Sequence, residues 1–160
     1  MIRKAEVIDP KSIIELEKEY YDKYSISEDL LLKWIKNGNF YVAEENSKII
    51  GSIYFEFLDE IKDLPWCHEP IAGLGKYIYI SEVAAESGEI NPALFDEVLK
   101  AGRENNCEGI VWLTGVKSNH DKIEQKFLKS NGFEKYKDVD NWECSPNYFI
   151  NDHSLWIKRL

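Results

Sequence analysis

GIVWLTGVKSNHDKIEQKFLKSNGFEKY, residues 109–136, is the stretch of this sequence that decides the fold. The apolar run at 110–113 is typical of a central strand that is covered on both faces. Ser118 and Asp121 have the spacing of a capping box, which predicts the start of a helix. The expected apolar face of that helix is Ile123, Phe127 and Leu128. The helix is expected to end at Asn131 and Gly132, before a further strand at 133–137.

Composition places the whole chain in one class. Its 160 residues are 44% apolar and 31% charged, which predicts a single globular domain, 1–160. There is no apolar stretch of membrane-spanning length and no apolar signal core after Met1, so we expect a cytoplasmic protein without a membrane partner. The formal charge of -9 would repel nucleic acid and attract a cation. Cys67, Cys107 and Cys144 are expected to be reduced thiols.

Strand and helix signals alternate along the rest of the chain. Strands are expected at 2–8, 40–43, 48–58, 77–84 and 153–158, and helices at 10–24, 28–37 and from Pro92. Asp9 and Asn91, each followed by proline, and Ser27 predict helix N-caps. The segment 59–76 predicts a long, functional loop, while 141–152 is aromatic and has no clear element. The fold class is therefore α+β, a mixed sheet of about six to seven strands flanked by about four helices.

This element order, together with Gly132 and Phe133, resembles the GNAT superfamily of N-acetyltransferases over essentially the whole chain. The family's last helix usually ends in a tyrosine-x-x-x-Gly-Phe pattern, and here Leu128 stands in place of the tyrosine. The resemblance implies acetyl-CoA as co-substrate, with its pantetheine arm between the splayed fourth and fifth strands. It also implies direct attack of a substrate amine on the thioester.

The loop after the fourth strand departs from the family pattern. Family members carry [Gln/Arg]-x-x-Gly-x-[Gly/Ala] there, and its backbone N–H groups bind the pyrophosphate. In this chain the two family glycines fall at Glu89 and Asn91, or about two residues away in an alignment on Val83, and only Gly88 lies nearby. Glu86 and Glu89 are either ordinary first-turn acids or carboxylates that occupy the anion site themselves. The resemblance implies cofactor contacts at Val83, Ala84, Ala85, Ser87, Gly88, Ile90, Asn91 and Asn119.

Glu82 is the candidate general base. It continues the face of Ile78 and Ile80, so that desolvation would make it a stronger base; the alternative is that Glu82 leaves the core and meets solvent. The Val83 N–H would polarise the thioester carbonyl. With Leu128 in the tyrosine position, Tyr136 is the candidate acid for the leaving thiolate, and Tyr79 and Tyr148 are its alternatives.

Two further groups of residues carry weaker signals. Cys67, His68 and Glu69 with Cys144 and His153 lack the spacing of a zinc site, so no metal is expected. An acceptor pocket is expected from Tyr20, Tyr21, Trp34, Trp66 and Trp142, with Glu56, Asp59 and Glu60 attracting a cation. The segment 142–156 is expected to form core and a homodimer surface.

Two functions stay open on the sequence. The first is an acetyl-CoA-dependent N-acetyltransferase that acts on a small-molecule or peptide amine. The second is a catalytically silent module of the same fold that binds a ligand or a protein partner.

Overall fold

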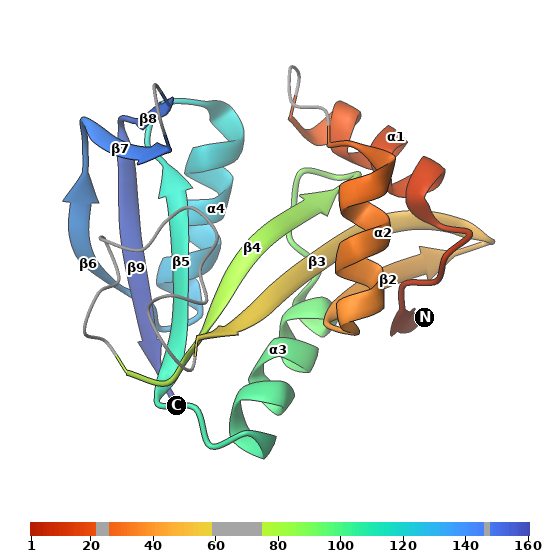
Figure 1. Ribbon diagram of the computed structural model, residues 1–160, viewed down its shortest axis with the longest axis horizontal. Coiled ribbons are helices and arrows are strands. Elements are labelled where there is room, and N and C mark those ends of the chain that lie inside the picture. The colour runs from red at the N-terminus through yellow and green to blue at the C-terminus, as the bar shows by residue number, and fades with distance from the viewer. Residues whose placement is uncertain (22–25, 59–74, 146–147) are drawn as a thin grey trace. The chain divides into compact units, whose positions relative to one another are not determined.

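The computed structural model describes residues 1–21, 26–58, 75–145 and 148–160, and of 142–148 the backbone alone where it lies in a strand (Figure 1). Its elements follow one another in this order: β1 (Ile2–Lys4), α1 (Pro10–Tyr20), α2 (Glu28–Asn37), β2 (Phe40–Glu45), β3 (Lys48–Leu58), β4 (Tyr77–Ala85), α3 (Pro92–Glu104), β5 (Gly109–Gly115), α4 (Asn119–Ser130), β6 (Glu134–Val139), β7 (Trp142–Ser145), β8 (Tyr148–Ile150) and β9 (His153–Arg159).

Seven strands form a mixed sheet in the order β1-β2-β3-β4-β5-β9-β6. β4 and β5 run parallel and pair from Tyr77 with Gly109 to Ile80 with Trp112, whereas β1–β2, β2–β3, β5–β9 and β6–β9 are antiparallel. β7 and β8 form a separate antiparallel hairpin. The α+β class, the seven-stranded mixed sheet and, within the described ranges, the four helices are confirmed.

The chain divides into two compact units that interleave in sequence. The first unit comprises residues 1–55 and 81–100, and the second comprises 56–80 and 101–160. The division runs through β3, β4 and α3, so each of these elements contributes to both units.

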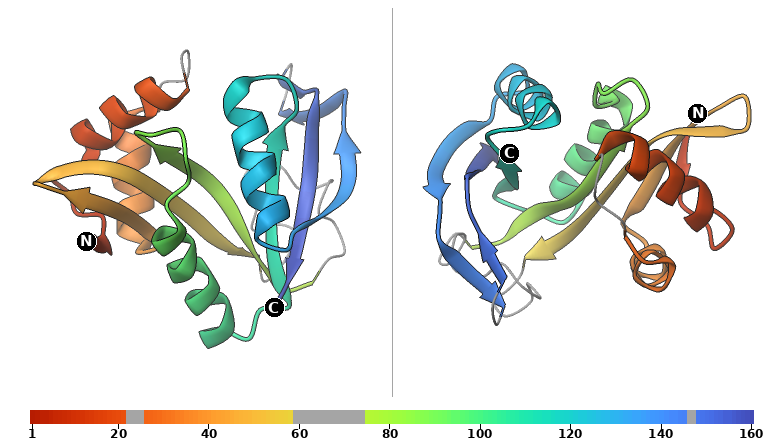
Figure 2. Two further views of the ribbon diagram at one scale, coloured as in Figure 1. Left: turned by 180° about the vertical axis from the view of Figure 1, so that it is seen from behind. Right: turned by 90° about the horizontal axis from the view of Figure 1, so that it is seen from above.

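The first unit has helices on both faces of its strands (Figure 2). On one face, Trp34 of α2 stacks on Tyr54 of β3 with ring centroids 4.6 Å apart, in a core that α1 also enters through Ile13. On the other face, Gly51 of β3 lies against α3, where an added Cβ would meet Leu94 Cδ1 at 3.2 Å. The alternation of side chains along β3 therefore separates the α1–α2 layer from the α3 layer.

In the second unit, β5 is a central strand with α4 on one side (Figure 1). Trp112 of β5 faces α4, since its ring lies 6.1 Å from that of Phe127 and 6.4 Å from that of Phe133. The opposite face holds an apolar cluster of Leu58, Tyr77, Tyr79, Val111, Val139, Leu155 and Ile157. The expected burial of both faces of this strand is confirmed.

Most expected helix caps are present. The Ser27 Oγ accepts a hydrogen bond from the Leu30 N–H at 3.3 Å, and Gly38 ends the same helix with φ +82°. Ser118 and Asp121 form the reciprocal capping box of α4. Asp9 stands at the predicted N-cap position of α1, directly before Pro10, but its carboxylate makes no capping hydrogen bond; it accepts instead from Arg3 Nη1 at 2.7 Å and from the Glu6 N–H at 2.7 Å.

Two boundaries and one assignment also differ from the sequence predictions. The first strand ends at Lys4 because the chain turns at once, with the Asp9 N–H donating to the Glu6 carbonyl at 2.9 Å. α1 ends at Tyr20, and Tyr24 lies outside the described residues. The unassigned segment 141–152 contains the β7–β8 hairpin. Within the described part of the chain, none of the helices is long and apolar enough to span a membrane.

Candidate functional site

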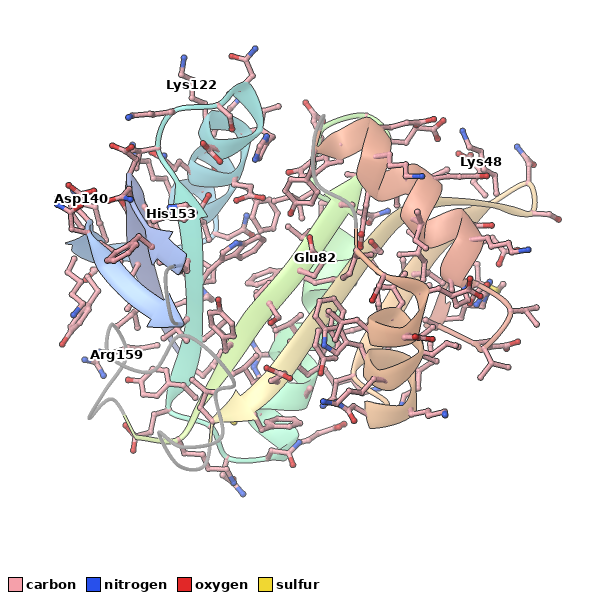
Figure 3. The ribbon with its side chains drawn as sticks, turned by 45° about the horizontal axis from the view of Figure 1, so that its top comes forward. Lys48, Glu82, Lys122, Asp140, His153 and Arg159 are labelled. Atoms are coloured by element: carbon pink, nitrogen blue, oxygen red, sulfur yellow. The ribbon has the colours of Figure 1, made fainter. Side chains whose placement is uncertain are left out.

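Glu82 lies near the C-terminal end of β4 in the first unit (Figure 3). Its side chain is 7% exposed, so the alternative that it leaves the core for solvent is excluded. The residues that follow it are also buried, with Val83 at 1% and Ala85 at 3% exposed. A carboxyl group in such surroundings is desolvated and positioned by packing, which are two properties of a general base.

The strand edge beside Glu82 is set by two hydrogen bonds. The Glu86 N–H donates to the Ile50 carbonyl of β3 at 3.0 Å, so alternation along the strand turns the N–H and C=O of Val83 away from β3. On that side the Tyr21 hydroxyl donates to the Val83 carbonyl at 2.6 Å. The backbone group expected to polarise a thioester, the Val83 N–H, therefore lies on the edge that β3 does not cover.

The loop between β4 and α3 is held by contacts of its own. The Gly88 N–H donates to the Ala85 carbonyl at 3.0 Å, and Gly88 has φ +71°, which suits glycine. Glu86 is bonded to Lys48 at the start of β3, and this hydrogen bond raises the pKa of Lys48. Asn91 caps α3, because its Oδ1 accepts from the Ala93 N–H at 3.0 Å.

The remaining predicted site residues belong to the second unit. Asn119 is the exposed first residue of α4. Tyr136 is 53% exposed on β6, at a bulge where Lys135 pairs with Trp156 and Lys137 pairs with Leu155. Tyr136 is one of the residues that line a pocket, together with Gly132, Ile157 and Arg159. The structure thus brings the predicted residues from Glu82 to Asn91 together, and it places Asn119 and Tyr136 in the other unit.

A buried polar pair at the end of β5 was not expected from the sequence. The Thr114 hydroxyl donates to Glu124 of α4, and the two residues are 2% and 4% exposed. Leu128, one turn further along α4, is fully buried. The buried residues of α4 are Asp121, Glu124 and Leu128. Of the expected apolar face, Leu128 is thus buried, whereas Ile123 and Phe127 are half-buried. The spacing of 121, 124 and 128 is helical, but charged residues in such a row normally indicate a solvent face.

Glu17 of α1 is a second functional candidate that the sequence did not single out. It is 1% exposed, and within the described ranges neither carboxyl oxygen has a hydrogen-bond partner. Burial raises its pKa to about 8. Glu17 precedes Tyr21 by four residues and so occupies the same side of the helical turn. Its position among the apolar residues Ile13, Leu16 and Tyr20 was the available signal.

The expected acceptor pocket is only partly described. Trp34 is a core residue stacked on Tyr54, and Tyr20 is 9% exposed, so both are packed rather than open. Asp59, Glu60 and Trp66 lie outside the described residues, as does the side chain of Trp142. Cys67, His68 and Glu69 also lie outside them, and the described residues contain no group of three or more His, Cys, Asp or Glu placed to hold a metal ion.

Comparison with known proteins gives one family and many similar folds. The family model described as "Acetyltransferase (GNAT) family" matches residues 11–133. Naa20 of Chaetomium thermophilum, solved with a bisubstrate analogue, is 16% identical with a TM-score of 0.75, and the match covers 100% of this chain and 86% of that one. No curated protein matches the chain.

Two further solved structures show the range of chemistry among similar folds. The PaiA N-acetyltransferase of Thermoplasma acidophilum, in complex with coenzyme A, is 16% identical with a TM-score of 0.72 over 100% of this chain and 98% of that one. The GphF GNAT-like decarboxylase, in complex with isobutyryl-CoA, is 17% identical with a TM-score of 0.74 over 99% and 98%.

Proposed function

Because the chain belongs to the acetyltransferase (GNAT) family, we propose that it transfers an acetyl group from acetyl-CoA to an amine. The observation that carries the proposal is Glu82, a buried carboxyl group on β4 directly before the Val83 N–H. This pair supplies a proton acceptor and a hydrogen-bond donor from adjacent residues. Support for the co-substrate comes from similar folds that contain coenzyme A or an acyl-CoA.

The reaction requires proton transfer from the amine. An alkylammonium group has a pKa of about 10 in solution and must lose a proton before it can attack a carbonyl carbon. Glu82 accepts that proton, the amine nitrogen bonds to the carbonyl carbon, and the Val83 N–H stabilises the negative oxygen. The carbon–sulfur bond then breaks and the nitrogen loses its second proton, so that one proton in all is released to solvent and one goes to the thiolate. Tyr136 is our candidate for protonating the thiolate and for regaining its proton from the nitrogen. The products are an amide and a free thiol.

We further propose that the acceptor is a cationic small molecule or peptide. The chain carries a formal charge of -9, which attracts cations over long distances. The first unit also contains Glu82, a carboxyl group that is 7% exposed. An ammonium group that approaches it would gain a favourable interaction in desolvated surroundings.

The residues present fit one end of acetyl-CoA and not the other. At the thioester end, Glu82 and the Val83 N–H suit amide formation. At the nucleotide end, the helix that should receive the pyrophosphate is already capped by Asn91, and Glu86 and Glu89 bring negative charge to the loop. No step of the proposed reaction therefore depends on the pyrophosphate.

Turnover and binding assays test the proposal together. Acetyl-CoA at 100 times its Kd should stabilise the protein by about 2.7 kcal/mol in a thermal-shift assay. Release of free thiol should depend on an amine chosen from a panel of diamines and basic peptides. Glu82→Gln should lower kcat about 10²- to 10⁴-fold, whereas Glu45→Gln, at an exposed position on β2, should not. Undiminished turnover by Glu82→Gln would reject this base.

A catalytically silent module is the second candidate. It is favoured by Leu128, which is fully buried and has no proton to donate where family members usually have tyrosine. If millimolar acetyl-CoA produces no thermal shift and no amine in the panel elicits thiol release, this candidate replaces the first.

A further inference from the structure

We propose that this chain recognises its acyl donor through the acyl-pantetheine arm and makes no productive use of the coenzyme A pyrophosphate. The inference rests on the proposed function, which it deepens by naming the class of donor: thioesters of pantetheine, with or without a nucleotide. The observations that carry it lie in the first unit, between Ala85 and Phe95.

The N–H groups of the first turn of α3 are already engaged and leave no donor there for a phosphate. An anion binds at a helix start through backbone N–H groups that have no partner within the helix. Here Pro92 has no N–H, and the Ala93 N–H donates to Asn91 Oδ1 at 3.0 Å. The N–H groups of Leu94 and Phe95 donate to the Asn91 carbonyl at 3.1 and 3.4 Å. One residue, Asn91, thus satisfies the donors of the first turn.

Half of the loop amides are engaged as well. The Glu86 N–H is bonded to Ile50 of β3, the Gly88 N–H to Ala85, and the Glu89 N–H to Ser87 Oγ at 3.3 Å. Within this described loop, the N–H groups of Ser87, Ile90 and Asn91 make none of these hydrogen bonds. Ile90 and Asn91 come next in the chain after Glu89, whose carboxylate opposes the approach of a phosphate.

The charges of the loop also disfavour a pyrophosphate. Glu86 and Glu89 are both exposed, and they place two negative charges at the end of a helix that would otherwise attract an anion. A cation beside the loop, Lys48 at the start of β3, is already bonded to Glu86; Figure 3 labels Lys48. A pyrophosphate would have to displace this ion pair or face a net negative loop. Both alternatives weaken its binding, whereas the buried Glu82 and Val83 are unaffected by the groups attached beyond the pantetheine arm.

Three donors with the same acetyl thioester test the inference on the full chain. Acetyl-CoA contains the pyrophosphate and adenosine, acetyl-4′-phosphopantetheine contains one phosphate, and S-acetylpantetheine contains none. We expect kcat/KM for acetyl-CoA and S-acetylpantetheine to agree within about tenfold, because a single charge-assisted hydrogen bond is already worth roughly 10- to 100-fold. A preference for acetyl-CoA above about 100-fold would overturn the inference and leave the acetyltransferase proposal intact.

The third donor separates two sources of the same chemistry. Equal kcat/KM values for all three donors would show that the protein uses coenzyme A thioesters and recognises only their pantetheine arm. A preference of about tenfold or more for acetyl-4′-phosphopantetheine identifies a donor whose arm is attached through one phosphate, as on a carrier protein. Both results support the inference. If the protein consumes none of the three donors with any amine, the proposed function fails and the inference falls with it.

A loop variant tests the cause. In Glu86→Gln/Glu89→Gln/Asn91→Gly, the two charges are removed and the Ala93 N–H is released, while glycine remains an acceptable N-cap. We expect kcat/KM for acetyl-CoA to rise about tenfold or more and that for S-acetylpantetheine to stay unchanged. Ser27→Gly is the matched control, because it removes the N-cap side chain of α2 and should change neither value. An equal change for both donors in the loop variant would contradict the inference.

Discussion

Replacing Glu17 by glutamine should make the protein more resistant to unfolding at alkaline pH. The carboxyl group is 1% exposed, and burial raises its pKa from 4.5 to about 8. The folded state therefore binds this proton more tightly than the unfolded state. Below about pH 4.5 the Glu17 carboxyl is protonated in both states and does not reduce the free energy of unfolding. As the pH rises from 4.5 toward 8, the unfolded state ionises first, so folding must either protonate Glu17 or bury its charge, and the free energy of unfolding falls.

The magnitude follows from the two pKa values. Between pH 5 and pH 8.5 the raised pKa of Glu17 should lower the unfolding free energy of the wild type by about 4 kcal/mol, since each unit of pKa difference corresponds to about 1.36 kcal/mol. Glutamine has the same shape and does not titrate. It buries an amide in its place, and the cost of that amide is the same at both pH values.

Urea denaturation at pH 5 and pH 8.5 measures the effect. The difference in unfolding free energy between Glu17→Gln and wild type should shift by about 4 kcal/mol in favour of the variant at the higher pH. Glu15→Gln, at an exposed position of the same helix, should show no such shift. If the difference for Glu17→Gln is the same at both pH values, Glu17 is ionised in the folded protein and the reasoning is refuted.

Three further changes test the packing and the polar contacts. Gly109→Ala should destabilise the protein by about 1–3 kcal/mol in the same denaturation assay, because the added Cβ would clash with the Lys158 carbonyl oxygen. Gly51→Ala should cost less, because its Cβ would meet a movable leucine methyl, Leu94 Cδ1, at 3.2 Å. Thr114→Val should cost about 1–3 kcal/mol by removing the hydroxyl donor to buried Glu124, and Thr114→Ser should recover most of it; equal losses would contradict the role of the hydroxyl. Burial raises the pKa of Asp9, but hydrogen bonds from its neighbours hold it below its ordinary value of 3.8, so Asp9→Asn should destabilise at pH 7 and the difference should shrink as the pH falls below that value; a difference that does not shrink on acidification would contradict this.

Local patterns predicted the elements of this fold well. The limits of β3, Lys48–Leu58, and the caps at Ser27, Ser118 and Asn91 follow from side-chain chemistry within a few residues. Asp9 shows where such reasoning fails. Asp9 before proline has the composition of an N-cap, but Arg3, six residues away in sequence, binds its carboxylate instead. A tertiary ion pair outcompeted the local preference.

The candidate site was predicted less completely than the fold. The burial of Glu82 could be anticipated because it continues an apolar row on β4. Glu17 and Glu124 were not anticipated, since a charged residue on an amphipathic helix is normally assigned to its solvent face. Their burial depends on which strand packs against the helix, and that information is not local. The cap of α3 by Asn91 was predicted, but the hydrogen bonds from the Leu94 and Phe95 N–H groups to the Asn91 carbonyl were not.

The hydrogen bond from Tyr21 bears on the polarity of the β4 edge. The N–H and C=O of a residue in an extended strand project from the same side, so at Val83 a hydrogen-bond donor lies next to an acceptor. Any negative oxygen drawn to the donor would be repelled by the neighbouring carbonyl dipole. The Tyr21 hydroxyl, 2.6 Å from that carbonyl oxygen, covers the repelling group. A phenol at the end of α1 thereby turns a neutral stretch of backbone into an electropositive one, and Tyr21→Phe would restore the neutral edge without touching Val83.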